Sequence, residues 1–104
     1  MNPSYGMVGT VSPERRDEAV AMAAKAYRCR PDEILSKSRA RQYAHARQYA
    51  MWLLRVRRDG QGRSIYSYPA VARAVGLTDH TTAIHAVRAV EDRYRAALQK
   101  QGEA

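Results

Sequence analysis

Apolar residues recur every three or four positions in several stretches of this chain, a spacing that places them on one face of a helix. Residues 13–27 carry small apolar side chains at this spacing, and residues 44–57 are rich in larger ones. Residues 79–97 carry a stripe of Ala83, Ala86, Val87, Val90 and Tyr94. We predict a helix over each stretch, with each stripe facing the core.

Proline and glycine positions divide the remainder of the chain. Ser12-Pro13-Glu14 is a helix start, because serine can cap, proline suits the first turn, and acid favours the positive helix end. Residues 31–35 and 69–75 also begin with proline and predict two short helices, the second ended by Gly76. Residues 36–41 and 57–68 read as loops; within the latter, residues 63–68 have strand propensity but no evident partner strand.

The sum is an all-α domain of about five helices. We expect a flexible arm over residues 1–11, one domain over 12–97, and a frayed tail over 98–104. The chain has 104 residues, which allows one modest core.

Charge is concentrated in the middle of the chain. The net charge is +8, and residues 36–63 hold eight cations against Asp59 alone, which gives +7. Fifteen of the eighteen cations are arginine, whose planar fork of donors suits phosphates and base edges. A basic stretch is often only a solvated face, but this concentration, with tyrosine, histidine and glutamine interleaved, favours a phosphate-binding surface.

Residues 69–95 have the layout of a helix-turn-helix: a short helix, a tight turn at Gly76 and a longer helix. The second helix opens with Thr78-Asp79-His80-Thr81-Thr82. In a helix-turn-helix such residues face base edges in the major groove, where Asp can accept from cytosine and Thr can contact a thymine methyl. The alternative is that they only cap and hydrate the helix end, and the residues alone leave both interpretations open.

Four segments together resemble the C-terminal DNA-binding domain of the DnaA family, the bacterial chromosomal replication initiators. Asp79-His80-Thr81-Thr82-Ala83-Ile84-His85-Ala86 is similar to the signature of that domain. Residues 34–39, 46–51 and 69–72 agree with other family segments in order and spacing. The resemblance covers roughly residues 15–95 and implies a fold like that of the Trp repressor.

The resemblance also implies roles for individual residues. Arg39 matches a loop arginine that enters the minor groove, while Asp79, His80, Thr81 and Thr82 match residues that read or contact bases. The positions at or near the phosphate backbone are Lys37, Arg41, Arg47, Gln48, Arg55, Pro69 and His85. The partner it implies is double-stranded DNA, at an asymmetric, A·T-rich box of the TTATCCACA kind, with other replication proteins as additional partners.

This sequence departs from the family pattern at three places. Thr78 stands where the family usually has Arg, Ala46 stands where it usually has Pro, and the connection from Arg57 to Tyr68 is longer than usual. No Gly-x-x-x-x-Gly-Lys-[Ser/Thr] segment occurs, so ATP-driven origin opening does not reside in these residues. We expect a free-standing protein that acts as a monomer on the asymmetric box.

Two other function classes were weighed. A protein-interaction adaptor would use the alanine-rich face of residues 13–27 or the Tyr66–Tyr68 segment, and would tolerate changes at His80 and Thr81. A hydrolase or nuclease lacks support, because no carboxylate cluster or Cys–His–Asp spacing is present. We expect no enzymatic activity, no cofactor and no metal, since Cys29 reads as a small buried residue. Without a signal peptide or apolar span, we expect the bacterial cytoplasm, at the nucleoid.

Overall fold

The computed structural model describes residues 10–103, apart from the side chain of Glu103, and within that range it is all-helical. Five helices follow in order: α1 (Pro13–Tyr27), α2 (Pro31–Ile34), α3 (Arg41–Arg55), α4 (Tyr68–Ala74) and α5 (His80–Glu103). The all-α prediction is therefore confirmed. The predicted arm, residues 1–11, lies mostly outside the described residues.

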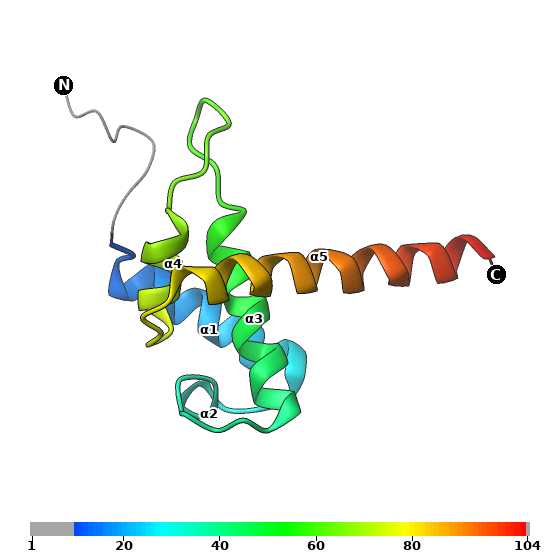
Figure 1. Cartoon of the computed structure of the whole chain (residues 1–104), viewed down its shortest axis with the longest axis horizontal. Helices are drawn as coiled ribbons and strands as arrows, with labels where there is room; N and C mark the ends of the chain where they lie inside the picture. The colour runs from blue at the N-terminus through cyan, green and yellow to red at the C-terminus, as the bar shows by residue number, and fades with distance from the viewer. Residues whose placement is uncertain (1–9, 104) are drawn as a thin grey trace.

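The core is built around α3, which packs against α1 on one side and α5 on the other, while α4 packs against α5 (Figure 1). Small residues dominate the contact faces, which lets the helix backbones approach closely. The buried alanines are Ala19, Ala23, Ala24, Ala46, Ala50, Ala70, Ala72, Ala83 and Ala86. The largest fully buried side chains, Ile34, Met51, Leu54, Val20 and Val71, fill the space between them.

Local capping fixes where the helices of the helix-turn-helix begin and end. The Ser67 hydroxyl accepts from the Ala70 N–H at 3.3 Å at the start of α4. At its end, the Gly76 N–H donates to Arg73 O (3.0 Å) and the Leu77 N–H to Ala72 O (2.9 Å). These two bonds make a Schellman turn, and Gly76 has the positive φ of 82° that this turn requires.

Three predicted helix boundaries were wrong. α3 begins at Arg41 rather than near residue 44, because the helical bonds already start with Ala44 N–H donating to Ala40 O (2.9 Å). It ends at Arg55 rather than Arg57, because the chain beyond turns into an extended segment. α5 continues to Glu103 rather than ending near Ala97. Leu98–Gln101 are good helix formers and contain no proline.

The predicted inward stripe of α5 is confirmed at four of its five positions. Ala83, Ala86, Val87 and Val90 are buried, whereas Tyr94 is 63% exposed. The second half of α5 extends beyond the other helices, so its inner side has nothing to pack against at Tyr94 (Figure 1).

The connection between α3 and α4 also differs from its prediction as a plain loop. Arg58 and Ser64 form an antiparallel bridge, and the Ile65 N–H donates to Arg57 O at 3.3 Å. Residues 63–65 therefore do have a pairing partner, which is the chain immediately after α3. We call residues 57–65 the hairpin; it projects from the body above α4 (Figure 1).

Candidate nucleic-acid interface

The first turn of α5 presents four polar side chains to solvent. Asp79, His80, Thr81 and Thr82 are all exposed. Asp79 Oδ1 accepts from the Thr81 N–H at 2.9 Å, and this bond is the main reason that the pKa of Asp79 lies below its usual value. The capping interpretation of Asp79 is therefore correct. The other carboxylate oxygen, Oδ2, takes no part in this bond.

An exposed basic segment lies beside this helix end. We call residues 35–40 the basic loop; Lys37 and Arg39 are exposed on it. Its serines stabilise its turns: the Ser36 hydroxyl donates to Glu33 O (2.6 Å) and accepts from the Ser38 N–H (3.2 Å). The Ser38 hydroxyl in turn accepts from the Ala40 N–H (3.2 Å). These bonds give the loop a defined path and leave its two cations pointing outward.

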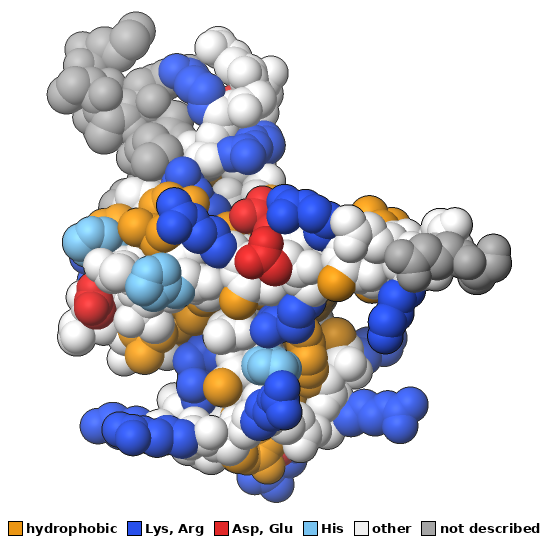
Figure 2. Space-filling view, turned by 45° about the vertical axis from the view of Figure 1, so that its right-hand side comes forward, with side chains coloured by type: hydrophobic (Ala, Val, Ile, Leu, Met, Phe, Trp, Pro, Cys, Tyr) orange, Lys and Arg blue, Asp and Glu red, His pale blue; other side chains and the backbone are white. Residues whose placement is uncertain are grey.

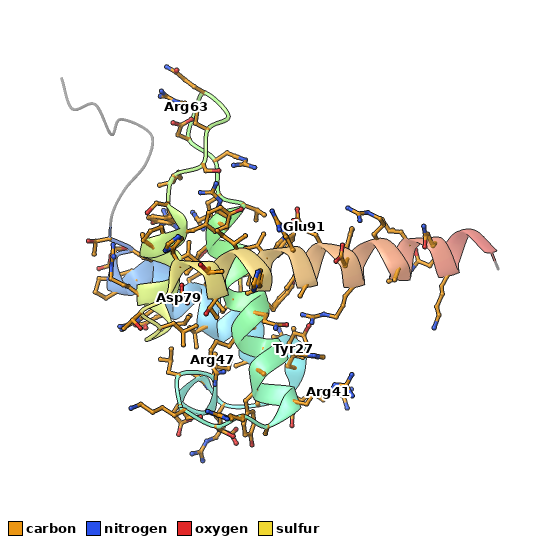
Figure 3. All side chains as sticks on the ribbon, viewed as in Figure 1. Tyr27, Arg41, Arg47, Arg63, Asp79 and Glu91 are labelled. Atoms are coloured by element: carbon orange, nitrogen blue, oxygen red, sulfur yellow. The ribbon has the colours of Figure 1, made fainter. Side chains whose placement is uncertain are left out.

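Arg47 on α3 supports the basic loop from beneath. Its Nε donates to Ile34 O at 2.9 Å, and its Nη2 donates to Ser36 O at 2.8 Å and Ser38 O at 3.2 Å. The side chain is half-buried, and burial lowers its pKa. The predicted phosphate-contact residue thus uses its Nε and Nη2 donors on the loop backbone, and in Figure 3 it lies between α3 and the basic loop.

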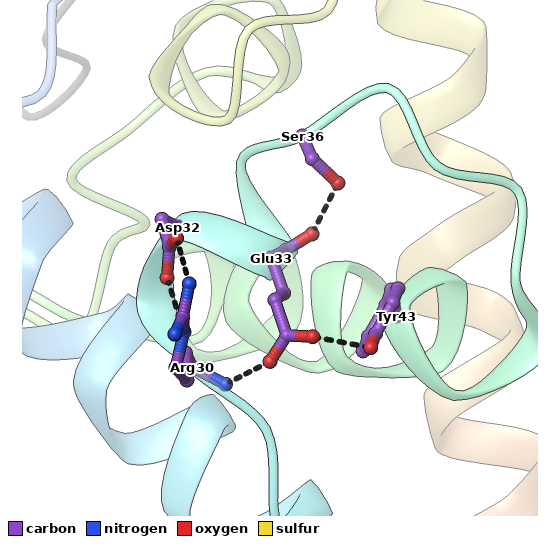
Figure 4. A network of polar contacts seen from close by, with 5 residues as sticks. All are labelled: Arg30, Asp32, Glu33, Ser36 and Tyr43. Atoms are coloured by element: carbon purple, nitrogen blue, oxygen red, sulfur yellow. Dashed lines mark hydrogen bonds and ion pairs between the residues drawn. The ribbon is translucent and has the colours of Figure 1, made fainter.

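A network around Glu33 holds the start of the basic loop against α3 (Figure 4). Glu33 accepts from the Arg30 N–H at 2.8 Å and from the Tyr43 hydroxyl on α3. The Tyr43 bond is the largest cause of the lowered pKa of Glu33, and the Arg30 N–H is the next. The Glu33 carboxylate therefore stays ionised, and its bond with Tyr43 connects the short helix α2 to α3.

The surface between the basic loop and the helix-turn-helix is hollowed. A groove of about 640 Å³ runs between the loop and the α4–α5 turn, and Arg39, Arg47 and Gly76 contribute to its walls. A smaller hollow of about 290 Å³ lies between α3 and α5, lined by Gln48, Thr82 and His85 among others. Arg47 and Leu77 line both, so the two hollows adjoin. Arg39 and Thr82 therefore line two hollows that share part of their walls.

Two other residues predicted to contact the DNA backbone, Arg55 and Gln48, make contacts inside the protein. The Arg55 Nη1 donates to Tyr66 O at 2.7 Å, and its guanidinium lies 4.0 Å over the Tyr68 ring. Gln48 Oε1 accepts from Arg93 Nη1 at 2.8 Å. Arg41 is exposed on the first turn of α3 and points away from Asp79 (Figure 3). Pro69 and His85 are exposed, as a contact residue must be.

Sequence reasoning missed Arg93, which lies beside Gln48 and His45. Burial is the main cause of the lowered pKa of His45, and the charges of Arg93 and Arg41 add to it. The Arg93 Nη2 is buried without a hydrogen-bond partner among the described residues. Helical periodicity gave the only available signal, because Arg93 follows three positions after the buried Val90.

The surfaces named for the adaptor alternative are largely used by the core. The alanine face of α1 is buried against α3, and Tyr66 is only 6% exposed. Tyr68 lies under the Arg55 guanidinium. The structure therefore offers a partner less of these surfaces than the sequence suggested.

The chain matches a known protein family over most of its length. The family described as "Bacterial dnaA protein helix-turn-helix" matches residues 17–90. The chain belongs to this DnaA helix-turn-helix family. The match extends from α1 into α5, and thus includes the basic loop, the hairpin and the exposed start of α5.

Individual DnaA proteins cover most of this chain at moderate identity. The chromosomal replication initiator protein DnaA of Dechloromonas aromatica is 35% identical over 85 residues, which is 82% of this chain. Those of Mesorhizobium japonicum and Sphingopyxis alaskensis are 36% and 39% identical over 75% and 72% of it. The aligned region is only 15–17% of the length of these relatives. No solved structure matches the chain.

The DnaA family matched here is a DNA-binding helix-turn-helix domain and not a catalytic one. Within residues 10–103 no group of three His, Cys, Asp or Glu side chains could hold a metal ion. Cys29 is half-buried, and burial raises the pKa of its thiol. Over the same residues, no helix combines the length and apolar character needed to cross a membrane.

Proposed function

We propose that this protein binds double-stranded DNA sequence-specifically at A·T-rich sites resembling the DnaA box. The observation that supports this most directly is that the start of α5 and the basic loop are both exposed and border two hollows that share wall residues. A helix end with short polar side chains suits base edges in the major groove, and an extended arginine suits a narrow A·T-rich minor groove.

The base-reading residues in this proposal are Arg39, His80, Thr81 and Thr82, with Asp79 both capping α5 and accepting from a base. Lys37, Pro69 and His85 contact the backbone around them. Arg47 acts by positioning the basic loop, since its Nε and Nη2 donate to Ile34, Ser36 and Ser38. Arg55 and Gln48 likewise order the surface from within.

The protein would act by occupying its sites as a monomer. A single helix-turn-helix beside a single basic loop matches an asymmetric site and does not require two-fold symmetry. Because the relatives are replication initiators by name, we place its sites in regions that control replication initiation, where occupancy also alters nearby transcription. This role places the protein in the bacterial cytoplasm, on the nucleoid.

Fluorescence anisotropy tests the proposal. A duplex with the sequence TTATCCACA is compared with a base-scrambled duplex at two salt concentrations. We expect a preference for the box that persists at the higher salt, because base contacts depend less on counterion release than phosphate contacts do. Equal binding that disappears with salt would refute the base-reading assignment, and no binding to either duplex would favour the adaptor.

A further inference from the structure

The hairpin is a well-ordered projection built on one carboxylate. Asp59 Oδ1 accepts from the Gln61 N–H at 2.8 Å and from the Arg63 N–H at 3.0 Å. The backbone adds the Asp59 N–H to Arg63 O at 2.9 Å, and Gly62 provides a positive φ of 80°. The bonds that Asp59 Oδ1 accepts from the Arg63 and Gln61 N–H groups hold the pKa of Asp59 below its ordinary value. The turn is therefore fixed by its own contacts, without help from the body of the protein.

The hairpin carries three arginines with different surroundings. Arg57 at its base pairs with Glu18 of α1 at 3.2 Å, which anchors the hairpin to the body. Arg58 and Arg63 are exposed further out. The Arg58 guanidinium donates to the neutral Ser64 hydroxyl and forms no ion pair within residues 10–103, whereas the Arg63 Nε pairs with Asp59 at 3.2 Å. The outer hairpin thus presents donors on a short, stiff support.

The hairpin and the basic loop lie on opposite sides of the start of α5. In Figure 1 the basic loop is at one end of the vertical axis and the hairpin at the other, and Figure 2 shows Lys and Arg side chains at both ends with histidines between. The molecule measures 33 Å along its second axis. A protein of this breadth covers about one turn of B-DNA, since half-sites one turn apart are separated by about 34–36 Å.

We propose that the hairpin is an additional DNA-binding element, in which Arg58 and Arg63 contact the sugar–phosphate backbone beside the box, on the side away from the basic loop. This inference rests on the proposed function, because it requires α5 and the basic loop to dock on the same duplex. The contacts add affinity without base preference, because they are made to phosphates. The longer connection from Arg57 to Tyr68 thereby widens the footprint of the protein on DNA.

Duplex length separates this contact from the box contacts. Binding is measured for a duplex that ends at the TTATCCACA box on both sides, and for duplexes with about ten base pairs added on one side or the other, because a protein about one turn of B-DNA wide would already be accommodated by a duplex with flanks on both sides. The variant is Arg58→Gln with Arg63→Gln, and the matched control, Lys25→Gln with Lys100→Gln, removes the same charge from α1 and the far part of α5. Thermal melting checks that both variants are folded.

We expect the native protein to gain affinity from an extension on one side only, and the hairpin variant to lose that gain. For two exposed ionic contacts the loss is about tenfold, and the salt slope on the extended duplex falls by about two. Arg58→Gln alone leaves the Asp59–Arg63 pair intact and should show part of the loss. Arg58→Lys with Arg63→Lys should restore most of the affinity.

The inference is overturned if the hairpin variant binds the extended duplex like the native protein, or if it loses the same factor on short and extended duplexes. Failure of the proposed function shows differently, as equal binding of the native protein to box and scrambled sequence on the short duplex. The two failures are therefore distinguishable in one set of titrations.

Discussion

The start of α5 and the basic loop present comparable chemistry by different means. At the start of α5 the exposed side chains are positioned by helix geometry and one local cap, Asp79 on the Thr81 N–H. The basic loop has no regular structure, and its path depends on donors from Arg47 that span 9 to 13 positions of sequence. The helix end can therefore be recognised from adjacent residues, whereas the loop depends on a residue in another element.

The largest effect on stability and DNA binding is expected at Arg47. Replacing it by Ala leaves three loop carbonyls without their donor, and hydrogen bonds to charged groups contribute about 1.5–3 kcal/mol each. We expect Arg47→Ala to lower stability by about 2 kcal/mol or more and to reduce box binding strongly. Chemical denaturation and anisotropy measure the two quantities.

Arg47→Lys decides between a positioning role and a phosphate contact. Lysine keeps the charge but lacks the fork that reaches several carbonyls at once. We expect it to bind DNA nearly as weakly as Arg47→Ala. Near-native binding of the lysine variant would show instead that Arg47 serves DNA through its charge.

The next effect is expected at the exposed readers of both regions. His80→Ala or Thr81→Ala should cost about 1–3 kcal/mol of binding and relax the preference at particular base pairs, with unchanged melting temperatures. Arg39→Ala should cost a similar amount, but only while the minor groove beneath it is A·T-rich. Competition with singly substituted boxes measures both, and a uniform loss on every duplex would contradict the assignment.

A smaller effect is expected from exchanging the cap of α5. Asp79→Asn keeps an oxygen that can accept from the Thr81 N–H but removes the charge, whereas Asp79→Ala removes both. Both variants should lose base preference, and only Asp79→Ala should also lower the melting temperature. If Asp79→Asn binds the box like the native protein, Asp79 serves as a cap alone.

The smallest effect concerns acid stability around α2. The folded pKa of Glu33 lies below its ordinary value, so its contribution to stability is complete above the unfolded pKa and disappears as pH falls through the folded one. Thermal melts from pH 6 to pH 2 should therefore decline less steeply for Glu33→Gln. Tyr43→Phe should also make the melting temperature decline less steeply over this pH range. The double variant should differ little from either single variant, because the two side chains share one hydrogen bond.

The sequence predicted those parts of the fold that local signals determine. Ser12, Pro31 and Gly76 correctly marked helix ends, because capping and φ preferences act within a few residues. The pairing of Arg58 with Ser64 was missed, since strand propensity does not reveal a partner and the pair is a single bridge. Tyr94 fits the periodicity of α5, but periodicity cannot show where the neighbouring helices end.

The candidate site also contains some residues that local sequence identifies and others whose roles depend on distant partners. Asp79 to Thr82 were identified from their order, and the structure presents all four to solvent. The roles of Arg47, Arg55 and Gln48 depend on partners 9 to 45 positions away, so residue type alone suggested phosphate contacts for side chains that bond within the protein.

The free half of α5 gives each bound molecule a visible polarity. A helix of 24 residues is about 36 Å long at 1.5 Å per residue, and one end of it carries the proposed base readers. On an asymmetric site, the other end projects in a direction fixed by the strand polarity of the box. A fluorophore near Lys100 and another on one duplex terminus would then report, by energy transfer, which way round each copy is seated, and so the relative orientation of neighbouring boxes.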